Sequence, residues 1–522
     1  MDFFTEMESK IPKTGVRTRF APSPTGYMHV GGLRTALYAY LIAKKAGGTF
    51  ILRIEDTDRT RYVADATEII ISTLKGAGLN YDEGPEIGGP VAPYTQSERK
   101  ALYRPYAELL CEKDAAYYCF CAKQDGETEN APDDNPQAEP ALSGTPRAAS
   151  PTATNADSGV TSKMPTLPEH DPCRDLVYAD SKKRVETGAS FVIRMKAPRE
   201  GETTVSDLVF GDVTTQNKTL DDMVLLKSDG MPTYNFANVV DDHLMGITHV
   251  LRGSEYISSA PKYNILYKAF GWEIPEYITV SLIMRDANNK LSKRHGDPTY
   301  DDLLKQGYLP QAVLNYVALL GWSPGGENEI FSLPQLVEAF EISGISKSPA
   351  IFDIEKLNHF NSEYIRSLPP EEFYKLATPY IKKAIKNEKT NVKAVAAILQ
   401  ARCEKLDDIP EKIDFFDKLP EYETGLFINK KSKTDLDVSA KMLKATTAIF
   451  NALPGWETET IGDALKAEAE KLEVKNATLM WPVRIAVSGK AVTPGGAVEI
   501  CEILGREETL KRIATAIEKL SS

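Results

Sequence analysis

The chain has 522 residues, of which 42% are hydrophobic and 26% charged, and its formal net charge is −12 at pH 7. The length predicts about three or four domains, and the composition excludes a disordered or fibrous protein. No run approaches the roughly 18 apolar residues of a membrane helix, and six cysteines in so long a chain favour a reducing compartment over a disulfide scaffold. The acidic total still permits a nucleic-acid partner, because binding needs only a local positive surface.

The first residues, MDFFTEMESK, are typical neither of a secretory signal nor of an arginine-rich transit peptide. We expect 1–15 to be an N-terminal extension, and whether a presequence precedes it stays open. A strand is predicted over 16–21, then a turn at PSPTG, a helix over about 30–46 and a strand at TFILRIED. This βαβ pattern favours a parallel sheet with a ligand at the carboxyl ends of its strands.

A composition break follows, rich in Pro, Ala, Ser and Asp and nearly without large apolar residues. We expect a disordered insertion at 123–168, because such a segment buries too little surface to offset its ordering entropy. A helix over 98–113 and a strand at FVIRMKAP surround it. Strand and turn signals continue through MVLLKSDGMPTYNFANVVDDHL and HVLRG, followed by a helix over 260–269 and a strand at YITVSLIM.

Beyond about 299 the apolar spacing becomes helical. Helices are predicted over 310–320, 334–341, 371–385, 392–406, 438–453, 461–472 and 506–520. The chain therefore reads as an interrupted α/β half followed by a helical half.

Two segments carry candidate chemistry. PSPTGYMHVGG, with His29, Gly31 and Gly32, lies between a strand and a helix, where backbone N–H groups can face a phosphate. The cluster KLSKR at 290–294 could neutralise a pyrophosphate leaving group. Taken singly, each also fits a structural role: a glycine-rich turn with a structural histidine, and a solvated charge run.

Together these segments resemble two signatures of the class I aminoacyl-tRNA synthetases, His-Ile-Gly-His and Lys-Met-Ser-Lys-Ser. The stretches RIEDTDRTRYV, YTQSER, LKSDGMPTYNFANVVDDHLMGITHVLRGSEY and RIAVSGKAVTPGGAVEICEILGREETLKRI are similar to the bacterial-type glutamyl-tRNA synthetases. The resemblance covers almost the whole chain except the first dozen residues and the insertion.

The resemblance implies a Rossmann-like α/β catalytic domain, an inserted α/β acceptor-binding domain and an all-helical C-terminal anticodon-binding region. We expect catalytic segments at 16–94 and 206–289, the acceptor-binding domain at 95–205, the KLSKR loop with a stem-contact region at 290–370, and the anticodon-binding domain at 371–522.

The resemblance also implies site residues. Those for glutamate, and in part for the neighbouring nucleotide, are Arg19, Ala21, Ser23, Glu55, Tyr234, Asn238 and Arg252. Those for ATP are His29, Gly31, Gly32, Glu255, Lys290, Leu291, Ser292, Lys293 and Arg294, with His29, Lys290 and Lys293 as the catalytic set. Guanidinium groups suit the substrate carboxylates, and Glu55 suits its ammonium.

The implied reaction has two steps. Glutamate attacks the α-phosphorus of ATP, helped by Mg²⁺ on the phosphates, and a ribose hydroxyl of the tRNA terminal adenosine then attacks the adenylate. Glutamine brings no charge, so an arginine built for a carboxylate would lose a bond worth roughly 1.5–3 kcal/mol. We therefore predict rejection of glutamine without an editing site.

Two further sites are expected from weaker similarity. Cys119, Cys121, Cys173 and Asp175, with His170 as an alternative to Asp175, are similar to a zinc site of some relatives, although reduced cysteines without metal are the favoured interpretation. Arg402 matches the position where the family places a helix facing the anticodon.

The predicted partners are L-glutamate and tRNA(Glu), with charging of tRNA(Gln) left open, no membrane, and a monomeric state. A glutaminyl enzyme is disfavoured because the C-terminal half reads helical, and a truncated paralogue because that half is present. A tRNA-binding scaffold with a decayed site is the non-enzymatic alternative. We expect the mitochondrial matrix as location, with bacterial cytoplasm as the alternative.

Overall fold

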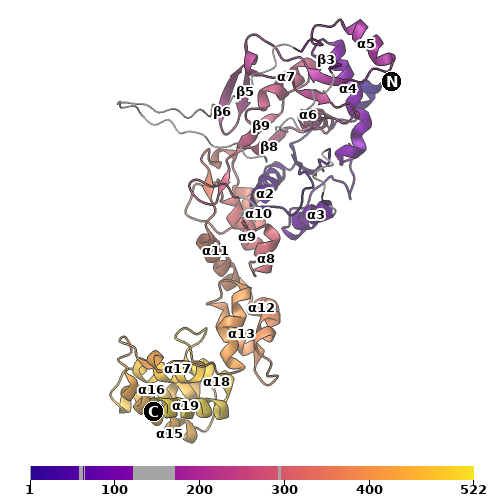
Figure 1. The fold of residues 1–522 in the computed structure, drawn as a ribbon. Helices are drawn as coiled ribbons and strands as arrows, with labels where there is room; N and C mark the ends of the chain where they lie inside the picture. The colour runs from indigo at the N-terminus through magenta and orange to yellow at the C-terminus, as the bar shows by residue number, and fades with distance from the viewer. Residues whose placement is uncertain (1, 58–62, 64, 122–170, 292–295, 522) are drawn as a thin grey trace, which may run out of the picture. The chain divides into compact units, whose positions relative to one another are not determined.

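The computed structural model describes residues 2–57, 63, 65–121, 171–291 and 296–521. The chain divides into two compact units, residues 1–300 with 317–352 and residues 301–316 with 353–522 (Figure 1). The predicted disordered insertion at 123–168 lies outside the described residues, as do Ser292, Lys293 and Arg294.

The first unit is built on a six-stranded sheet in the order β2-β1-β8-β9-β5-β6. All neighbours in it pair in parallel except β6, which is antiparallel to β5. Its strands are β1 (Arg17–Phe20), β2 (Thr49–Leu52), β5 (Glu202–Asp207), β6 (Gly211–Gln216), β8 (His249–Gly253) and β9 (Glu276–Val280). Helix α2 (Val30–Lys45) connects β1 to β2, so the predicted βαβ unit is confirmed.

Two smaller sheets complete this unit. An antiparallel sheet has the order β3-β4-β7, and a parallel pair joins β10 to β11. Their strands are β3 (Ala116–Cys119), β4 (Val192–Met195), β7 (Val224–Leu226), β10 (Ile283–Met284) and β11 (Ala350–Ile351). The short β4 alternates inward and outward residues, as a strand with one buried face does.

Helices of the first unit pack against these sheets and bury a shared core that includes Phe236, Val250 and Leu266. Besides α2, they are α1 (Phe3–Ser9), α3 (Ala66–Gly76), α4 (Lys100–Glu112), α5 (Tyr178–Glu186), α6 (Tyr234–Leu244), α7 (Ala260–Phe270) and α10 (Leu333–Ala339), with short 3-10 turns at Gln96–Arg99, Asn217–Thr219, Ser254–Tyr256 and Ile342–Gly344.

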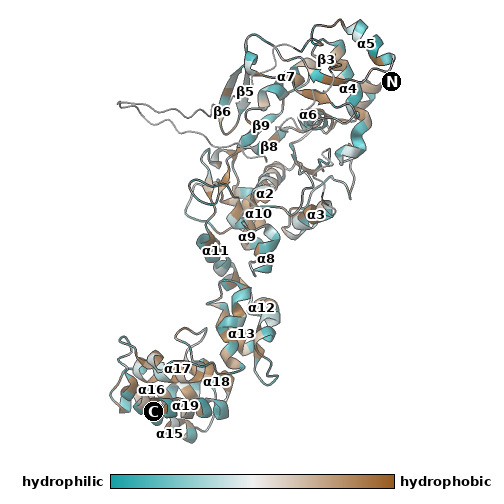
Figure 2. Ribbon diagram, viewed as in Figure 1, coloured by the Kyte–Doolittle hydropathy of each residue, from teal (hydrophilic) through white to brown (hydrophobic). Residues whose placement is uncertain are grey.

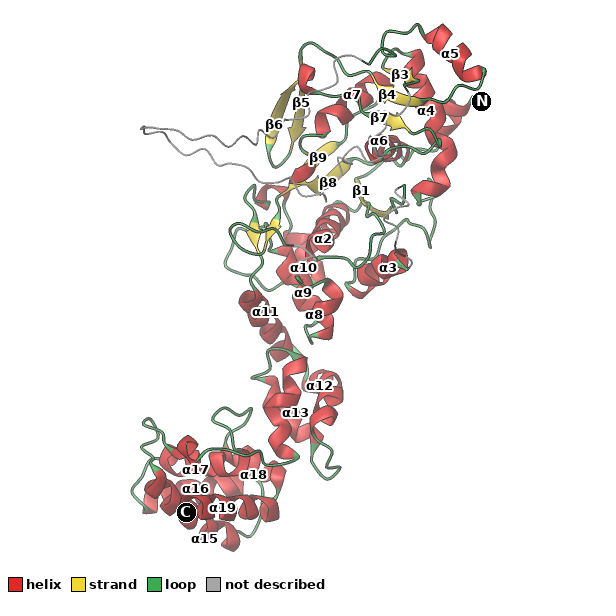
Figure 3. Cartoon of the chain, in the orientation of Figure 1, coloured by secondary structure: helices red, strands yellow, loops and turns green. Residues whose placement is uncertain are grey.

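The second unit consists of helices joined by loops (Figure 3). They are α8 (Tyr300–Lys305), α9 (Pro310–Ala318), α11 (Ile354–Ser367), α12 (Pro370–Ala384), α13 (Val392–Gln400), α14 (Ile409–Ile413), α15 (Leu436–Ala452), α16 (Thr458–Lys471), α17 (Asn476–Ser488), α18 (Ala497–Leu504) and α19 (Arg506–Ser521), with 3-10 turns at Leu406–Asp408, Asp414–Phe416 and Thr424–Phe427. Most carry hydrophobic and hydrophilic residues side by side (Figure 2), and their apolar faces form one core.

Within the described ranges, no helix is both long and apolar enough to cross a membrane. Two predicted elements differ from the structure. The segment 234–244, interpreted as strand and turn, is the helix α6, whose Phe236, Val240 and Leu244 follow helical spacing. The helix predicted to reach 406 ends at Gln400, because the chain turns there and the Leu406 N–H bonds to the carbonyl of Gly307 at 3.1 Å.

Candidate active site

The carboxyl ends of β1 and β2 bring two motifs side by side. The Arg53 N–H donates to the carbonyl of Phe20, and the Glu55 N–H to that of Pro22, each at 3.0 Å. The turn that holds Ala21 and Ser23, both half-buried, is thereby fixed against the strand extension that carries Glu55. This edge is where a parallel sheet offers a ligand site.

His29 caps the N-terminus of α2. Its Nδ1 accepts the N–H groups of Gly31 at 2.9 Å and Gly32 at 3.3 Å, which assigns the imidazole hydrogen to Nε2. A Cβ atom at Gly31 would lie 2.7 Å from the His29 ring, so glycine is needed for this cap. The helix start therefore presents backbone dipole and an N–H donor in one place.

The segment beyond the cationic cluster returns to His29. His29 forms an antiparallel bridge with Thr299, and the Tyr300 N–H bonds to the carbonyl of Met28 at 3.3 Å. On the other side, Lys290 bridges to Met284, and the Leu291 N–H bonds to the carbonyl of Ile283 at 3.0 Å. Both ends of the predicted ATP loop are thus anchored in the first unit, one of them at His29, although Ser292, Lys293 and Arg294 themselves lie outside the described residues.

Arg252, at the end of β8, is buried with a guanidinium that is only partly satisfied. Its Nε and Nη1 have no hydrogen-bond partner among the described residues. The guanidinium carbon lies 4.7 Å from the ring centre of Tyr263, 5.4 Å from Tyr277 and 5.7 Å from Tyr256. A small pocket opens beside it, lined also by Tyr256, Tyr277 and Thr279. A buried cation in an aromatic cage, with open donors on both edges of its guanidinium, can bind a carboxylate.

Helix α6 contributes Tyr234 and Asn238. The Asn238 side chain is buried and donates to the carbonyls of Tyr234 at 2.9 Å and Asn235 at 3.2 Å, while its Oδ1 has no partner among the described residues. Burial raises the pKa of Tyr234 well above its usual value, and the nearby Tyr256 and Glu55 add to the shift. The phenol therefore stays neutral at physiological pH.

Glu55 is 3% exposed. Its Oε1 accepts from Arg53 Nη2 at 2.9 Å and Arg53 Nε at 3.2 Å, and Gln96 Nε2 lies 3.5 Å away. Burial raises the pKa of the Glu55 carboxyl, although the charges of Arg53 and Arg19 oppose the shift. A carboxylate held this way suits an ammonium group.

The other predicted nucleotide contact, Glu255, lies in the turn Ser254–Tyr256 directly after β8. Its Oε2 is buried without a hydrogen-bond partner in the described part of the chain.

The sequence interpretation did not assign a role to Asp242 or Arg53, which connect the predicted residues. Asp242 Oδ1 accepts from Arg19 Nε at 2.9 Å and from Arg53 Nη1 at 2.7 Å, and Oδ2 accepts from Arg19 Nη2 at 3.2 Å. Although burial acts to raise the pKa of Asp242, the guanidiniums of Arg19 and Arg53 lower it to about 2. The sequence signal that could have identified Asp242 is the pair of consecutive aspartates, Asp241 and Asp242, in an otherwise apolar segment, because buried carboxylates need cationic partners.

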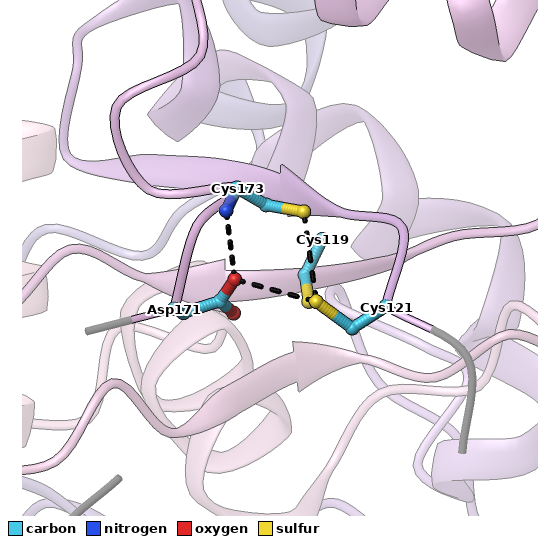
Figure 4. A group of neighbouring side chains, drawn as sticks. All are labelled: Cys119, Cys121, Asp171 and Cys173. Carbon is cyan, nitrogen blue, oxygen red and sulfur yellow. Dashed lines mark hydrogen bonds between the residues drawn. The ribbon is translucent and has the colours of Figure 1, made fainter. Parts of the chain in front are cut away.

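Three predicted cysteines gather with a carboxylate at the end of β3 (Figure 4). The donor atoms of Cys119, Cys121, Cys173 and Asp171 all lie within 4.8 Å of one another. The carboxylate is Asp171 and not the predicted Asp175, because Asp171 turns back to accept the Cys173 N–H at 2.9 Å. The alternative His170 lies outside the described residues.

In the second unit, Arg402 follows α13 and is exposed. Its Nη1 donates to the carbonyl of Thr493 at 2.9 Å, while Arg484 Nη2 donates to that of Ala491 at 2.9 Å. Two guanidiniums thus hold one loop, with Val492 between them 85% exposed. Burial and the charge of Arg402 lower the pKa of Arg484, as expected for cations close together.

The parallel sheet, the His29 cap that pairs with Thr299 beyond the KLSKR motif, and the helical second unit are the features expected of a class I aminoacyl-tRNA synthetase. A family model described as tRNA synthetases class I (E and Q), catalytic domain, matches residues 15–359, and one described as Anticodon binding domain matches residues 372–517. This chain belongs to the class I tRNA synthetases of the glutamate and glutamine branch.

Curated relatives support the assignment over almost the full length. A glutamate–tRNA ligase of Clostridium tetani is 52% identical over 97% of this chain and 98% of its own, and one of Clostridium botulinum is 50% identical over 97% and 99%. The crystal structure of a glutamate tRNA ligase from Elizabethkingia meningosepticum in complex with its amino acid has a TM-score of 0.81 and 34% identity, covering 97% of this chain and 99% of that one. These relatives are bacterial and give no support to the expected mitochondrial location.

Proposed function

We propose that this chain is a glutamate–tRNA ligase that forms glutamyl-adenylate from L-glutamate and ATP and transfers the glutamyl group to the terminal adenosine of tRNA(Glu). The observation that carries the proposal is Arg252, a buried guanidinium with two open donors that lies 3.9 Å from Asp242, the carboxylate that also accepts from Arg53, the partner of Glu55. It matches a substrate that has a carboxylate side chain and an α-ammonium group.

In the first step, the α-carboxylate of glutamate attacks the α-phosphorus of ATP and pyrophosphate leaves. Glu55 holds the ammonium group, Arg252 and Arg19 hold carboxylates, and the His29 imidazole donates to phosphate oxygen. Mg²⁺ on the phosphates supplies further charge neutralisation when bound. Lys290 borders the basic segment predicted to face pyrophosphate.

In the second step, the 2′-hydroxyl of the terminal adenosine attacks the adenylate carbonyl and AMP leaves. This mechanism needs no protein nucleophile, so positioning and charge supply the catalysis. The segment 95–205 is proposed to bind the acceptor end, and the loop held by Arg402 and Arg484 to face the anticodon. The monomeric state stays a prediction, and bacterial cytoplasm is the proposed location.

The test is aminoacylation of purified tRNA(Glu) and tRNA(Gln), each offered glutamate and glutamine with ATP. We expect glutamate on tRNA(Glu) and no glutamine on either tRNA. Charging of tRNA(Gln) with glutamate would widen the substrate range without changing the reaction. Tight tRNA binding without any charging would instead favour the scaffold alternative.

We also propose that Cys119, Cys121, Cys173 and Asp171 bind zinc. Tetrahedral zinc with bonds to sulfur of about 2.3 Å places two thiolates roughly 3.8 Å apart. The Sγ atoms of Cys121 and Cys173 lie 3.7 Å apart, and the donor set of three thiols and a carboxylate is one that zinc accepts. This supports zinc over the initially favoured reduced cysteines.

Metal analysis of the purified protein tests the zinc proposal. We expect about one zinc per chain in the wild type and a loss in Cys173→Ser, with Cys111→Ser, a buried cysteine outside the cluster, as the control. Burial raises the pKa of Cys121 to about 12, so zinc binding must release protons and its affinity should increase with pH. Equal zinc content in all three proteins would contradict the assignment.

A further inference from the structure

Behind the proposed glutamate pocket lies a buried group of charges, here named the Asp242 cluster: Asp242, Arg19, Arg53, Arg252 and Glu55. Asp242 is 1% exposed and receives three hydrogen bonds, two from Arg19 and one from Arg53. Arg252 Nη2 lies 3.9 Å from its Oδ2. One carboxylate thus contacts every guanidinium of the cluster.

The cluster has an unequal number of charges. Three guanidiniums face the two carboxylates of Asp242 and Glu55, which leaves a net charge of +1. Asp207, which is not part of the Asp242 cluster, also lines the pocket; its Oδ1 accepts the N–H groups of Val209 and Phe210 at 2.8 Å each, and its Oδ2 is buried without a hydrogen-bond partner among the described residues. Free glutamate at neutral pH has two carboxylates and one ammonium, a net charge of −1, whereas glutamine is neutral and glutarate has a charge of −2.

Asp242 also determines which donor atoms of the arginines are already hydrogen-bonded and which stay open. Arg19 uses Nε and Nη2 on Asp242 and Nη1 on the carbonyl of Leu251 at 3.1 Å. Arg252 makes no hydrogen bond from Nε or Nη1 within the described part of the chain. Arg19 is therefore fixed in position, with one N–H of each terminal nitrogen left over for a carboxylate, and Arg252 keeps Nε and Nη1 for the ligand.

We propose that Asp242 is a specificity-determining positioning residue that holds Arg19 and Arg53 and limits the net charge of the Asp242 cluster to +1, so that Glu55 remains available for the α-ammonium of glutamate. Without it, the buried guanidiniums would turn to the nearest remaining carboxylate, Glu55, and cover the group that takes the α-ammonium. The cluster would then have a net charge of +2, one unit more positive than in the wild type, and would favour a dianion without an ammonium. This inference rests on the proposed function.

The test uses Asp242→Asn, which keeps the shape of the side chain and removes its charge. We expect the KM for glutamate to rise at least tenfold, the inhibition constant of glutarate to fall at least threefold, and the KM for ATP to stay within twofold. If Asp242 acts only in folding, the binding of glutamate and of glutarate should both weaken, or neither should change. Parallel changes of glutamate and glutarate would overturn the proposal.

The matched control is Glu83→Gln. Glu83 is similarly buried and makes a bidentate pair with Arg17 at 2.8 and 2.9 Å, outside the Asp242 cluster. This variant should lower the melting temperature without changing the ratio of the two ligand constants. A shift of that ratio as large as in Asp242→Asn would overturn the assignment to Asp242.

If Asp242→Asn does not fold, Asp242→Ser serves as the second variant, because it removes the same charge and leaves room for a water molecule. The KM for glutamate should again rise and the inhibition constant of glutarate should again fall. If neither change occurs, the proposal is contradicted. Wild-type charging of glutamate is measured alongside: its failure would refute the proposed function, whereas wild-type activity with parallel ligand changes in the variant would refute only the role of Asp242.

Discussion

Glu55 lies in the buried extension of β2, where burial raises the pKa of its carboxyl above the ordinary value of 4.5. Only the ionised form attracts the ammonium of a substrate. Because a raised pKa means protonation at higher pH, the charge of Glu55 is fully present well above that pKa and is lost as pH falls through it. Acidification should therefore weaken glutamate binding at a pH where exposed carboxylates are still ionised.

We predict that the KM for glutamate rises as the pH falls from neutral in the wild type. Glu55→Gln should raise the KM at pH 7 by about one to two orders of magnitude, since a charge-assisted bond is worth roughly 1.5–3 kcal/mol. It should also flatten the dependence on pH. Steady-state KM measured at several pH values checks both outcomes, and equal pH slopes in the two proteins would show that another group titrates.

The sequence predicted the site residues at the ends of strands, but not Asp242 and Arg53, which connect them. Glu55 and Arg252 stand in long motifs at the ends of buried strands, so resemblance and chemistry agree on them. Asp242 forms hydrogen bonds with Arg19, which is 223 residues away in the sequence, and with Arg53, which is 189 residues away. No local pattern encodes such pairings, because they depend on which helix covers which strands.

At the scale of elements, strong periodicity was sufficient for prediction. The helix predicted over 30–46 is confirmed as α2, and the strand HVLRG as β8. Helix α6 was misassigned because β-branched valines and a preceding strand-like run hid its helical spacing. The helix is stabilised by tertiary packing, because its apolar side chains lie in the core of the first unit.

Helix α1 belongs to the predicted extension and precedes the matched family region, which begins at residue 15. Its Phe4 ring lies 5.2 Å from Tyr106 and its Phe3 ring 5.9 Å from the same side chain. Glu8 contacts His243 of α6 at 2.7 Å. The extension is thus packed against elements that support the glutamate pocket.

Replacing both Phe3 and Phe4 by alanine should destabilise the first unit by about 2 kcal/mol, because each ring is half-buried and contacts other aromatic side chains. The expected result is a lower melting temperature with an unchanged KM for glutamate. Glu6→Ala, which removes only an exposed ion pair with Lys10, is the control. A changed KM would instead give α1 a direct part in the site.

For the whole molecule, the spacing of apolar residues predicted an α/β half followed by a helical half, and both are present. All described residues of the proposed glutamate site lie in the first unit, whereas Arg402 lies in the second. Amino-acid selection and tRNA selection should consequently be separable by mutation.

Arg402→Ala should raise the KM for tRNA(Glu) by roughly tenfold, the lower range of a lost base contact, and leave the KM for glutamate unchanged. Lys389→Ala, which removes one exposed charge from the same unit, should change the KM for tRNA only slightly. Measuring both variants with tRNA(Glu) and with an anticodon-substituted tRNA separates base reading from general attraction. If Arg402 reads the anticodon, the anticodon substitution should raise the KM for tRNA much less in Arg402→Ala than in the wild type. If the effects of the two changes on the KM are fully additive, Arg402 does not read the anticodon.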